Sequence, residues 1–182
     1  MGLWPGRRRK RHERVGFLLY GAAVAAARQP WFYAELGVPD TLDGRFDLLS
    51  LFVFLLIERL RPEPMPGPAL AQAVFDAMFS DMDVNLREMG VGDLSVGKKV
   101  KAMWNAFHGR SIAYAAALAS GDEAALEAAI ARNVWRGAAP PPGSASALAR
   151  LVSAARAELD HQPLVALSEG KVSFPPPLET VS

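Results

Sequence analysis

The sequence contains no cysteine among its 182 residues, and this absence excludes zinc fingers, thiol nucleophiles, iron–sulfur clusters and c-type haem attachment. The net charge is also small, at +1, which excludes a uniformly basic nucleic-acid coat protein and an acidic tail protein. The two hydrophobic runs, residues 15–27 and 48–57, fall short of the roughly 20 residues that cross a bilayer. Because 51% of the residues are apolar, a chain of this length can bury the core of one globular domain without disulfides or metal.

The small net charge conceals a basic N-terminal segment. Residues 1–14 carry six cations and one carboxylate, a net of +5, so residues 15–182 sum to −4. Such a charge run predicts a disordered, flexible arm that can touch an anionic membrane surface or RNA. The contact residues expected in that arm are Arg7, Arg8, Arg9, Lys10, Arg11 and Arg14.

Residues 15–27 admit two interpretations. A basic segment followed by a short apolar stretch that ends in Ala25 and Ala27 imitates a secretory signal with its cleavage site. The same stretch is typical of an alanine-rich helix, and Pro30 then opens a second short helical turn, because proline is favoured at the first helical position. The local pattern leaves both interpretations open.

Residues 48–57 form the most apolar segment of the chain. Asp43 is a candidate N-cap for a helix over residues 44–61, because its side-chain oxygen can accept hydrogen bonds from the free amides of the first turn, and Pro62 ends that helix. Within it, the stretch LLSLFVFLLI is apolar on nearly all sides, which indicates a central helix rather than an amphipathic one. We therefore expect the domain to form around residues 48–57.

Glycine and proline divide the rest of the chain into further helices. Apolar residues recur every three to four positions, and no alternating strand pattern extends beyond a few residues. The expected fold class is therefore all-α: a single multi-helix domain over residues 15–160, between the arm and a proline-containing C-terminal tail, residues 161–182, that is frayed. The further helices are expected at residues 68–89, 95–120, 123–135 and 146–159, with residues 138–144 as a linker.

Residues 92–99, GDLSVGKK, imitate a phosphate-binding loop. They satisfy the pattern G-x4-G-K, but Lys99 stands where such a loop needs the Ser or Thr hydroxyl that binds Mg²⁺. A phosphate loop also follows a buried strand, whereas this segment joins two predicted helices, the second of which Asp93 or Ser95 can cap. We therefore expect no binding of ATP or GTP.

Acidic side chains cluster between residues 76 and 88, where a paired acid–base site or a di-metal site has to be considered. A di-metal helical bundle needs Glu-x-x-His pairs, and the three histidines, at positions 12, 108 and 161, are far apart. His108 is therefore expected to be a surface or hydrogen-bonded residue rather than a ligand. No nucleophile motif occurs either, so we expect no catalytic residue, no metal and no cofactor, and a protein that is not an enzyme.

An acidic helix end, a Gly-x-Gly turn and a basic helix start follow one another in FSDMDVNLREMGVGDLSVGKKVK, residues 79–101. FHGRSIAY, residues 107–114, follows, and GVPDTLDGRFD, residues 37–47, lies upstream. In these segments the sequence resembles the ubiquinol–cytochrome c chaperone family, assembly factors that help to make cytochrome b of the respiratory bc1 complex. The resemblance extends over about residues 17–120, which favours a helix over a cleaved signal at residues 15–27.

The resemblance implies a non-catalytic helical assembly chaperone that binds newly made cytochrome b or other bc1 assembly proteins, without a cofactor, a nucleotide or DNA. It implies work at the inner membrane, as a peripheral protein on the cytoplasmic side in a bacterium or on the matrix side in a mitochondrion. Mitochondrial relatives act with a small partner and the translating ribosome. The alternative function is a peripheral membrane- or RNA-binding helical module that acts through the arm.

The partner-binding residues expected from this resemblance surround a turn at residues 90–97 that holds two helices in register. Asp83 and Arg87 are four positions apart, which places them for an ion pair across one helical turn. The polar rim comprises Asp81, Asp83, Arg87, Glu88, Lys98, Lys99, Lys101 and Arg110, and the partner-binding set adds Gly90, Gly92, Asp93, Gly97 and Tyr114.

Overall fold

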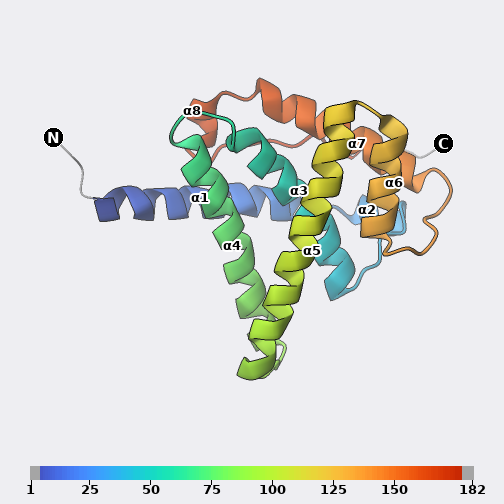
Figure 1. The fold of residues 1–182 in the computed structure, drawn as a ribbon, viewed down its shortest axis with the longest axis horizontal. Helices are drawn as coiled ribbons and strands as arrows, with labels where there is room; N and C mark the ends of the chain where they lie inside the picture. Colours follow the sequence, from blue (N-terminus) through green and yellow to red (C-terminus); the bar gives the residue numbers. More distant parts are fainter. Residues whose placement is uncertain (1–4, 178–182) are drawn as a thin grey trace.

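The protein is built from helices packed around one central helix (Figure 1). The computed structural model describes residues 5–177, and within that range it contains no strand, so the all-α prediction is confirmed. The helices are α1 (Pro5–Ala27), α2 (Pro30–Ala34), α3 (Leu42–Leu60), α4 (Gly67–Glu88), α5 (Asp93–Ser120), α6 (Glu123–Val134), α7 (Ser144–His161) and α8 (Leu164–Leu167).

Helix α3 is the centre of the core, as its sequence predicts. Every residue from 46 to 57 is buried, and α3 contacts α1, α4, α5, α6 and α7. The predicted N-cap, however, is wrong. The hydroxyl of Thr41 accepts a hydrogen bond from the amide of Gly44 at 3.1 Å, while Asp43 lies in the first turn, where a negative charge interacts favourably with the helix dipole.

Helix α1 corrects the prediction of a disordered arm. It begins at Pro5 and runs without a break to Ala27, so the described part of the arm is helical; residues 1–4 lie outside the described range. Arginine and lysine are good helix formers, and Arg9 pairs with Glu13 one turn later at 2.9 Å. Because the second half of α1 is held by packing, the charged first half only extends a helix that already exists.

The second half of α1 belongs to the core. Val15, Leu19 and Ala23 are buried, and α1 packs on α4 and α3. The two helices approach closely at Gly16, where an added Cβ would lie 2.6 Å from the backbone of Ala73. Residues 15–27 are therefore an integral helix of the fold, as the second interpretation of that segment predicts.

The C-terminal segment is packed rather than frayed, in contrast to the prediction. Leu167 on the short helix α8 is fully buried, and the ring of Phe174 packs edge-on against Phe52 of α3 at 5.3 Å. Gly170 lies against the side chain of Leu18 on α1. Apolar residues between the polar ones thus attach this segment to the core as far as Phe174; residues 178–182 lie outside the described range.

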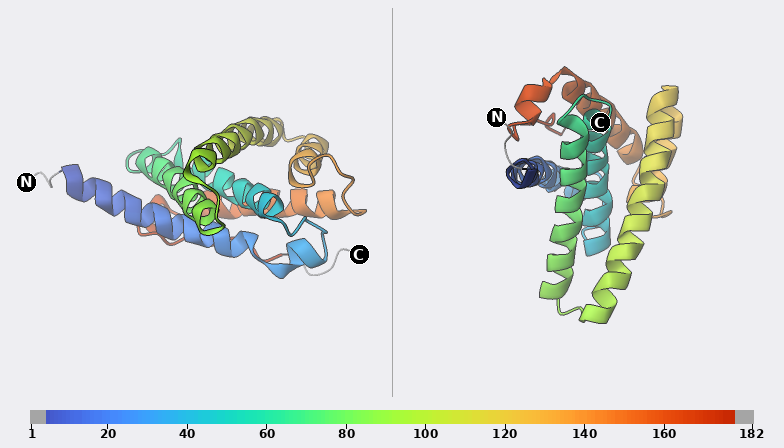
Figure 2. Two further views of the ribbon diagram at one scale, coloured as in Figure 1. Left: turned by 90° about the horizontal axis from the view of Figure 1, so that it is seen from below. Right: turned by 60° about the vertical axis from the view of Figure 1, so that its left-hand side comes forward.

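Helices α4 and α5, joined by a short turn, form a hairpin that projects from the body (Figures 1 and 2). Gly90 supplies the left-handed conformation of that turn, with φ of +81°. The turn is shorter than the predicted residues 90–97, because α5 already begins at Asp93. Val96 is fully buried and anchors the first turn of α5, so Gly97, Lys98 and Lys99 are helical.

Candidate partner-binding surface on the helical hairpin

A charged network joins the two helices at the hairpin end. The guanidinium Nε of Arg87 on α4 lies 2.6 Å from a carboxylate oxygen of Asp83, which confirms the predicted ion pair, and Arg87 also pairs with Asp93 at the start of α5. All three side chains are 40% or more exposed, so these pairs contribute only about 0–1 kcal/mol to stability. They present charge to solvent more than they hold the fold together.

Free cations lie beside this network. Lys98, Lys99 and Lys101 on α5 are exposed, and among the described residues no ion pair involves them. Glu88 is exposed on α4. We call residues 83–101 the hairpin tip. It carries both signs of charge, which is the character that the sequence predicts for this surface.

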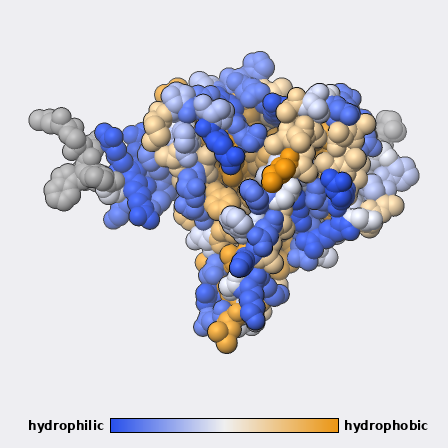
Figure 3. Space-filling model, viewed as in Figure 1, coloured by the Kyte–Doolittle hydropathy of each residue, from blue (hydrophilic) through white to orange (hydrophobic). Residues whose placement is uncertain are grey.

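Exposed apolar side chains at the hairpin tip were not predicted from the sequence. Leu94 is 91% exposed, and Met89 and Val84 are also exposed; hydrophobic atoms show at the end of the hairpin in Figure 3. A helical pattern predicts which residues share a face. It does not predict whether another part of the chain packs on that face. Exposed apolar side chains rimmed by charge are typical of a protein contact.

An aromatic groove lies between α3, α4 and α5, where the two helices of the hairpin diverge. Two adjoining hollows of about 340 and 200 Å³ share Ile57, Arg61, Phe75 and Trp104 in their lining. The rings of Trp104 and His108 stack at 5.6 Å, and His108 is exposed, so it is a surface residue as predicted. The groove offers a second apolar surface, which was not predicted from the sequence either.

Two residues of the predicted partner-binding set, Arg110 of the rim and Tyr114, point into the fold, and this corrects their assignment. Arg110 is only 10% exposed and lies 2.6 Å from the buried carboxylate of Asp47. Tyr114 is fully buried, and this burial raises the pKa of its hydroxyl. Both side chains point inward because α5 turns this face toward α3, so they support the fold and are not available to a partner in this structure.

Asp81, another predicted rim residue, also has a structural partner. It accepts a 2.6 Å hydrogen bond from the hydroxyl of Tyr20 on α1. Burial, followed by this hydrogen bond, raises the pKa of Tyr20, so its hydroxyl remains a donor at neutral pH. Asp81 therefore ties α4 to α1, while Asp83, Arg87, Glu88 and the three lysines remain as exposed candidates for binding.

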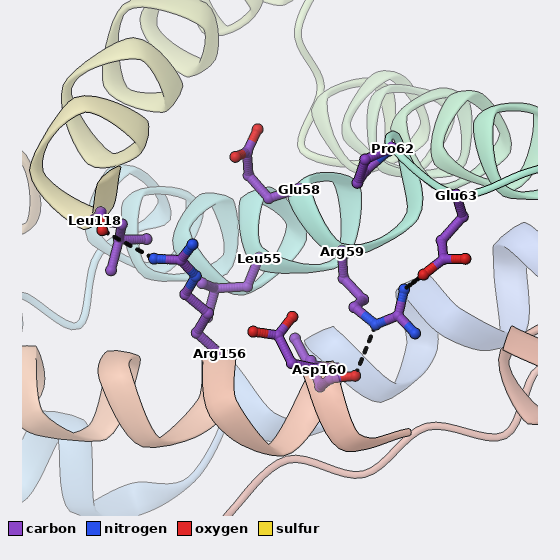
Figure 4. A pocket seen from close by; sticks show the side chains of 9 residues that line it. Leu55, Glu58, Arg59, Pro62, Glu63, Leu118, Arg156 and Asp160 are labelled. Carbon is purple, nitrogen blue, oxygen red and sulfur yellow. Dashed lines mark hydrogen bonds and ion pairs between the residues drawn. The ribbon is translucent and has the colours of Figure 1, made fainter. Parts of the chain in front are cut away.

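A hollow of about 330 Å³ between α3, α5 and α7 is lined by charged groups (Figure 4). Arg59 donates to the backbone carbonyls of Leu159 and Gln162, both at 2.8 Å, and Arg156 donates to the carbonyl of Leu118 at 3.0 Å. The last carbonyls of a helix lack partners within it. These arginines satisfy such groups near the ends of α5 and α7, which is a structural role.

The described residues can also be compared with the requirements of a metal site, a membrane span and a phosphate-binding loop. Among residues 5–177, no group of three or more His, Asp or Glu side chains could hold a metal ion. Each helix in this range is too short or too polar to span a bilayer. The G-x4-G-K segment does not form a loop, because Gly97, Lys98 and Lys99 lie inside α5, where backbone amides are bonded within the helix rather than free to hold a phosphate.

The chain is similar to a known protein family and to a protein of known crystal structure. A sequence profile described as "Ubiquinol-cytochrome C chaperone" matches residues 34–174. The family match therefore starts later than the resemblance over residues 17–120 and extends beyond it, to residue 174. The chain is 40% identical to the protein in the crystal structure of the Cbp3 homolog from Brucella abortus. The TM-score is 0.81, and 92% of each chain is covered.

More distant relatives carry names that describe assembly. The chain is 23% identical over 116 residues to ubiquinol-cytochrome-c reductase complex assembly factor 1 of Xenopus laevis, covering 64% of this chain and 58% of that protein. It is 25% identical over 118 residues to the assembly factor of the same name from Homo sapiens, covering 65% and 38%. The chain thus matches between 38% and 58% of the length of these relatives.

Proposed function

The chain belongs to the ubiquinol–cytochrome c chaperone family, and from this premise we propose that it binds newly made cytochrome b, or proteins that assemble with it, during biogenesis of the respiratory bc1 complex. The relatives are named as assembly factors of ubiquinol–cytochrome c reductase. In this proposal the protein is a non-catalytic chaperone that needs no cofactor.

The observation that carries the proposal is the mixed surface of the hairpin tip. It combines exposed Leu94 and Met89 with charges of both signs, on two helices that project from the body. A membrane protein under assembly presents apolar segments next to charged loops, and such a client needs both kinds of contact. Charge complementarity would set the specificity and the rate of encounter, and the apolar side chains would supply the buried contact area.

The proposed place of action is the surface of the membrane into which cytochrome b is inserted. In a bacterium this is the cytoplasmic face, with the protein bound peripherally. A small partner protein and the ribosome, expected from mitochondrial relatives, are further candidate contacts of the same surface.

Charge reversal at the hairpin tip tests the proposal. The double variants Lys98→Glu with Lys101→Glu, and Asp83→Lys with Glu88→Lys, should fold normally because exposed charges contribute about 0–1 kcal/mol. In cells that lack this protein we expect low cytochrome b and low bc1 activity, which the wild-type chain restores and these variants do not. The matched control is Arg132→Glu with Arg150→Glu, two exposed positions on α6 and α7, which should restore both.

Two outcomes separate the function from the surface. Normal accumulation of cytochrome b in the deletion strain would contradict the proposed function. Full rescue by both tip variants would leave the proposed function standing but would contradict the assignment of client binding to the hairpin tip. In that case Trp104→Ala with Ile112→Ser, which removes two partly exposed apolar side chains of the groove, tests the second surface in the same strain.

A further inference from the structure

The outward face of α1 carries a second pattern, distinct from the hairpin. Lys10, Arg14 and Phe17 follow one another at spacings of four and three, so they share one side of the helix, and all three are exposed. The opposite side buries Val15 and Leu19 against the body. Along the exposed side, cations therefore occupy the first turns, and apolar groups follow directly after them.

The cations of this face are free and project from the molecule. Arg8, Lys10, Arg11 and Arg14 are exposed, and among the described side chains of the arm only Arg9 has an ion-pair partner. The first turns of α1 extend beyond the rest of the fold in Figure 2 and are covered by hydrophilic atoms in Figure 3. A concentration of unpaired positive charge on an otherwise acidic chain fits a partner with a dense anionic surface.

The exposed apolar residues of this face distinguish between two anionic partners, RNA and a phospholipid bilayer. Phe17 and Leu18 are each 52% exposed, in the turn that follows Arg14. Phosphates of RNA would bind the cations, and an unpaired base could stack on the ring of Phe17, but RNA offers no apolar partner to the aliphatic side chain of Leu18. A bilayer offers both, because its headgroups carry the negative charge and the boundary of its acyl chains accepts an aromatic or aliphatic side chain.

We propose that the exposed face of α1, residues 8–18, binds the surface of an anionic phospholipid bilayer. Lys10, Arg11 and Arg14 contact the headgroups, and Phe17 enters the boundary of the acyl chains. The contact leaves the buried side of α1 unchanged, so it needs no rearrangement of the fold. It is independent of which client the hairpin tip binds.

Vesicle flotation with the full chain tests the proposal. We expect binding to vesicles of phosphatidylcholine mixed with phosphatidylglycerol and little binding to phosphatidylcholine alone. Each cation near such a surface strengthens binding roughly fivefold, so Lys10→Gln, Arg11→Gln and Arg14→Gln together should weaken it on the order of a hundredfold. Salt at ~1 M, which shortens the Debye length to about 3 Å, should have a similar effect on the wild type.

Phe17→Ser should weaken vesicle binding severalfold while all charges are retained. The matched control is Lys98→Gln, Lys99→Gln and Lys101→Gln, which removes the same three charges from the hairpin tip and should leave vesicle binding unchanged. Circular dichroism and melting temperature establish that each variant is folded, as expected for substitutions of exposed side chains.

Three results would overturn the inference. The first is wild-type vesicle binding by the triple arm variant, and the second is an equal loss in the hairpin control. The third is tighter binding of poly-uridine than of anionic vesicles at the same salt, with Phe17→Ser binding vesicles like the wild type, which would make the arm an RNA contact. Capture of cytochrome b in detergent by the arm variant reports on the proposed function separately.

Discussion

The guanidinium of Arg110 on α5 lies 2.6 Å from the carboxylate of Asp47 on α3, a side chain with no exposed surface. Arg136, in the segment between α6 and α7, pairs with the same carboxylate. Burial raises the pKa of Asp47, and the hydrogen bond from Arg136 and the charge of Arg110 oppose that rise. One carboxylate therefore connects the central helix to two later parts of the chain.

Removal of this carboxylate should be strongly destabilising. Asp47→Ala leaves the nearly buried Arg110 without its partner, and breaking a buried ion pair typically costs about 3–5 kcal/mol. Urea unfolding of the purified protein measures the loss. The control is Asp83→Ala at the hairpin tip, which should cost about 0–1 kcal/mol because its partner Arg87 is exposed. Equal losses in the two variants would contradict a structural role specific to Asp47.

Tyr114 offers a test of whether it holds the fold or binds a partner. Its hydroxyl is buried and has no hydrogen-bond partner among the described residues, and a buried polar group without a partner costs about 1–3 kcal/mol. Tyr114→Phe should therefore keep or raise the free energy of unfolding, and it should capture cytochrome b like the wild type. Loss of capture by a variant of unchanged stability would return Tyr114 to the binding surface.

The positions of Arg110 and Tyr114 show which part of the site the sequence could not predict. Residues 48–57 reveal their burial locally, because every side of that helix is apolar. An arginine on a helix gives no such signal. Whether Arg110 faces solvent depends on Asp47, which is 63 positions away in the sequence, and on how α5 rotates against α3. The i,i+4 pair of Asp83 and Arg87, by contrast, depends only on helical spacing and could be predicted.

The same distinction explains the two ends of the chain. The basic segment before residue 15 has the composition of a disordered arm, yet it continues a helix whose later turns are held by the core. The proline-containing segment after residue 161 looks frayed, yet Leu167 and Phe174 attach it to buried residues. In both places a few apolar contacts with distant residues determine the outcome, and local composition does not contain them.

Alkaline pH should destabilise the protein through its tyrosines. The pKa of Tyr20 is raised above its ordinary value of 10.0 by burial and by the hydrogen bond to Asp81, and the pKa values of Tyr33 and Tyr114 are raised as well. In the unfolded chain these hydroxyls lose their protons near pH 10, whereas in the folded chain they retain them. The unfolded state therefore binds fewer protons, and stability falls as pH rises through this range.

The variant Tyr20→Phe separates the contribution of this residue. At neutral pH it should cost about 1 kcal/mol for the lost hydrogen bond. Above pH 10 its free energy of unfolding should decline less steeply than that of the wild type, because one raised pKa has been removed. Urea unfolding at a series of pH values measures both effects. A slope identical to that of the wild type would show that Tyr20 ionises in the folded chain at its ordinary pKa.

Two glycines of the predicted turn should respond to alanine in opposite directions. Gly90 has φ of +81°, a conformation that costs an alanine about 1–2 kcal/mol, so Gly90→Ala should lower the free energy of unfolding. Gly97 lies inside α5 with no atom within 4 Å of an added Cβ, so Gly97→Ala should raise it by about 0.5–1 kcal/mol. Urea unfolding measures both changes, and neither substitution alters a charge of the hairpin tip. Destabilisation by Gly97→Ala would mean that the turn extends to residue 97 after all, whereas stabilisation with loss of cytochrome b capture would show that a partner approaches the backbone at Gly97.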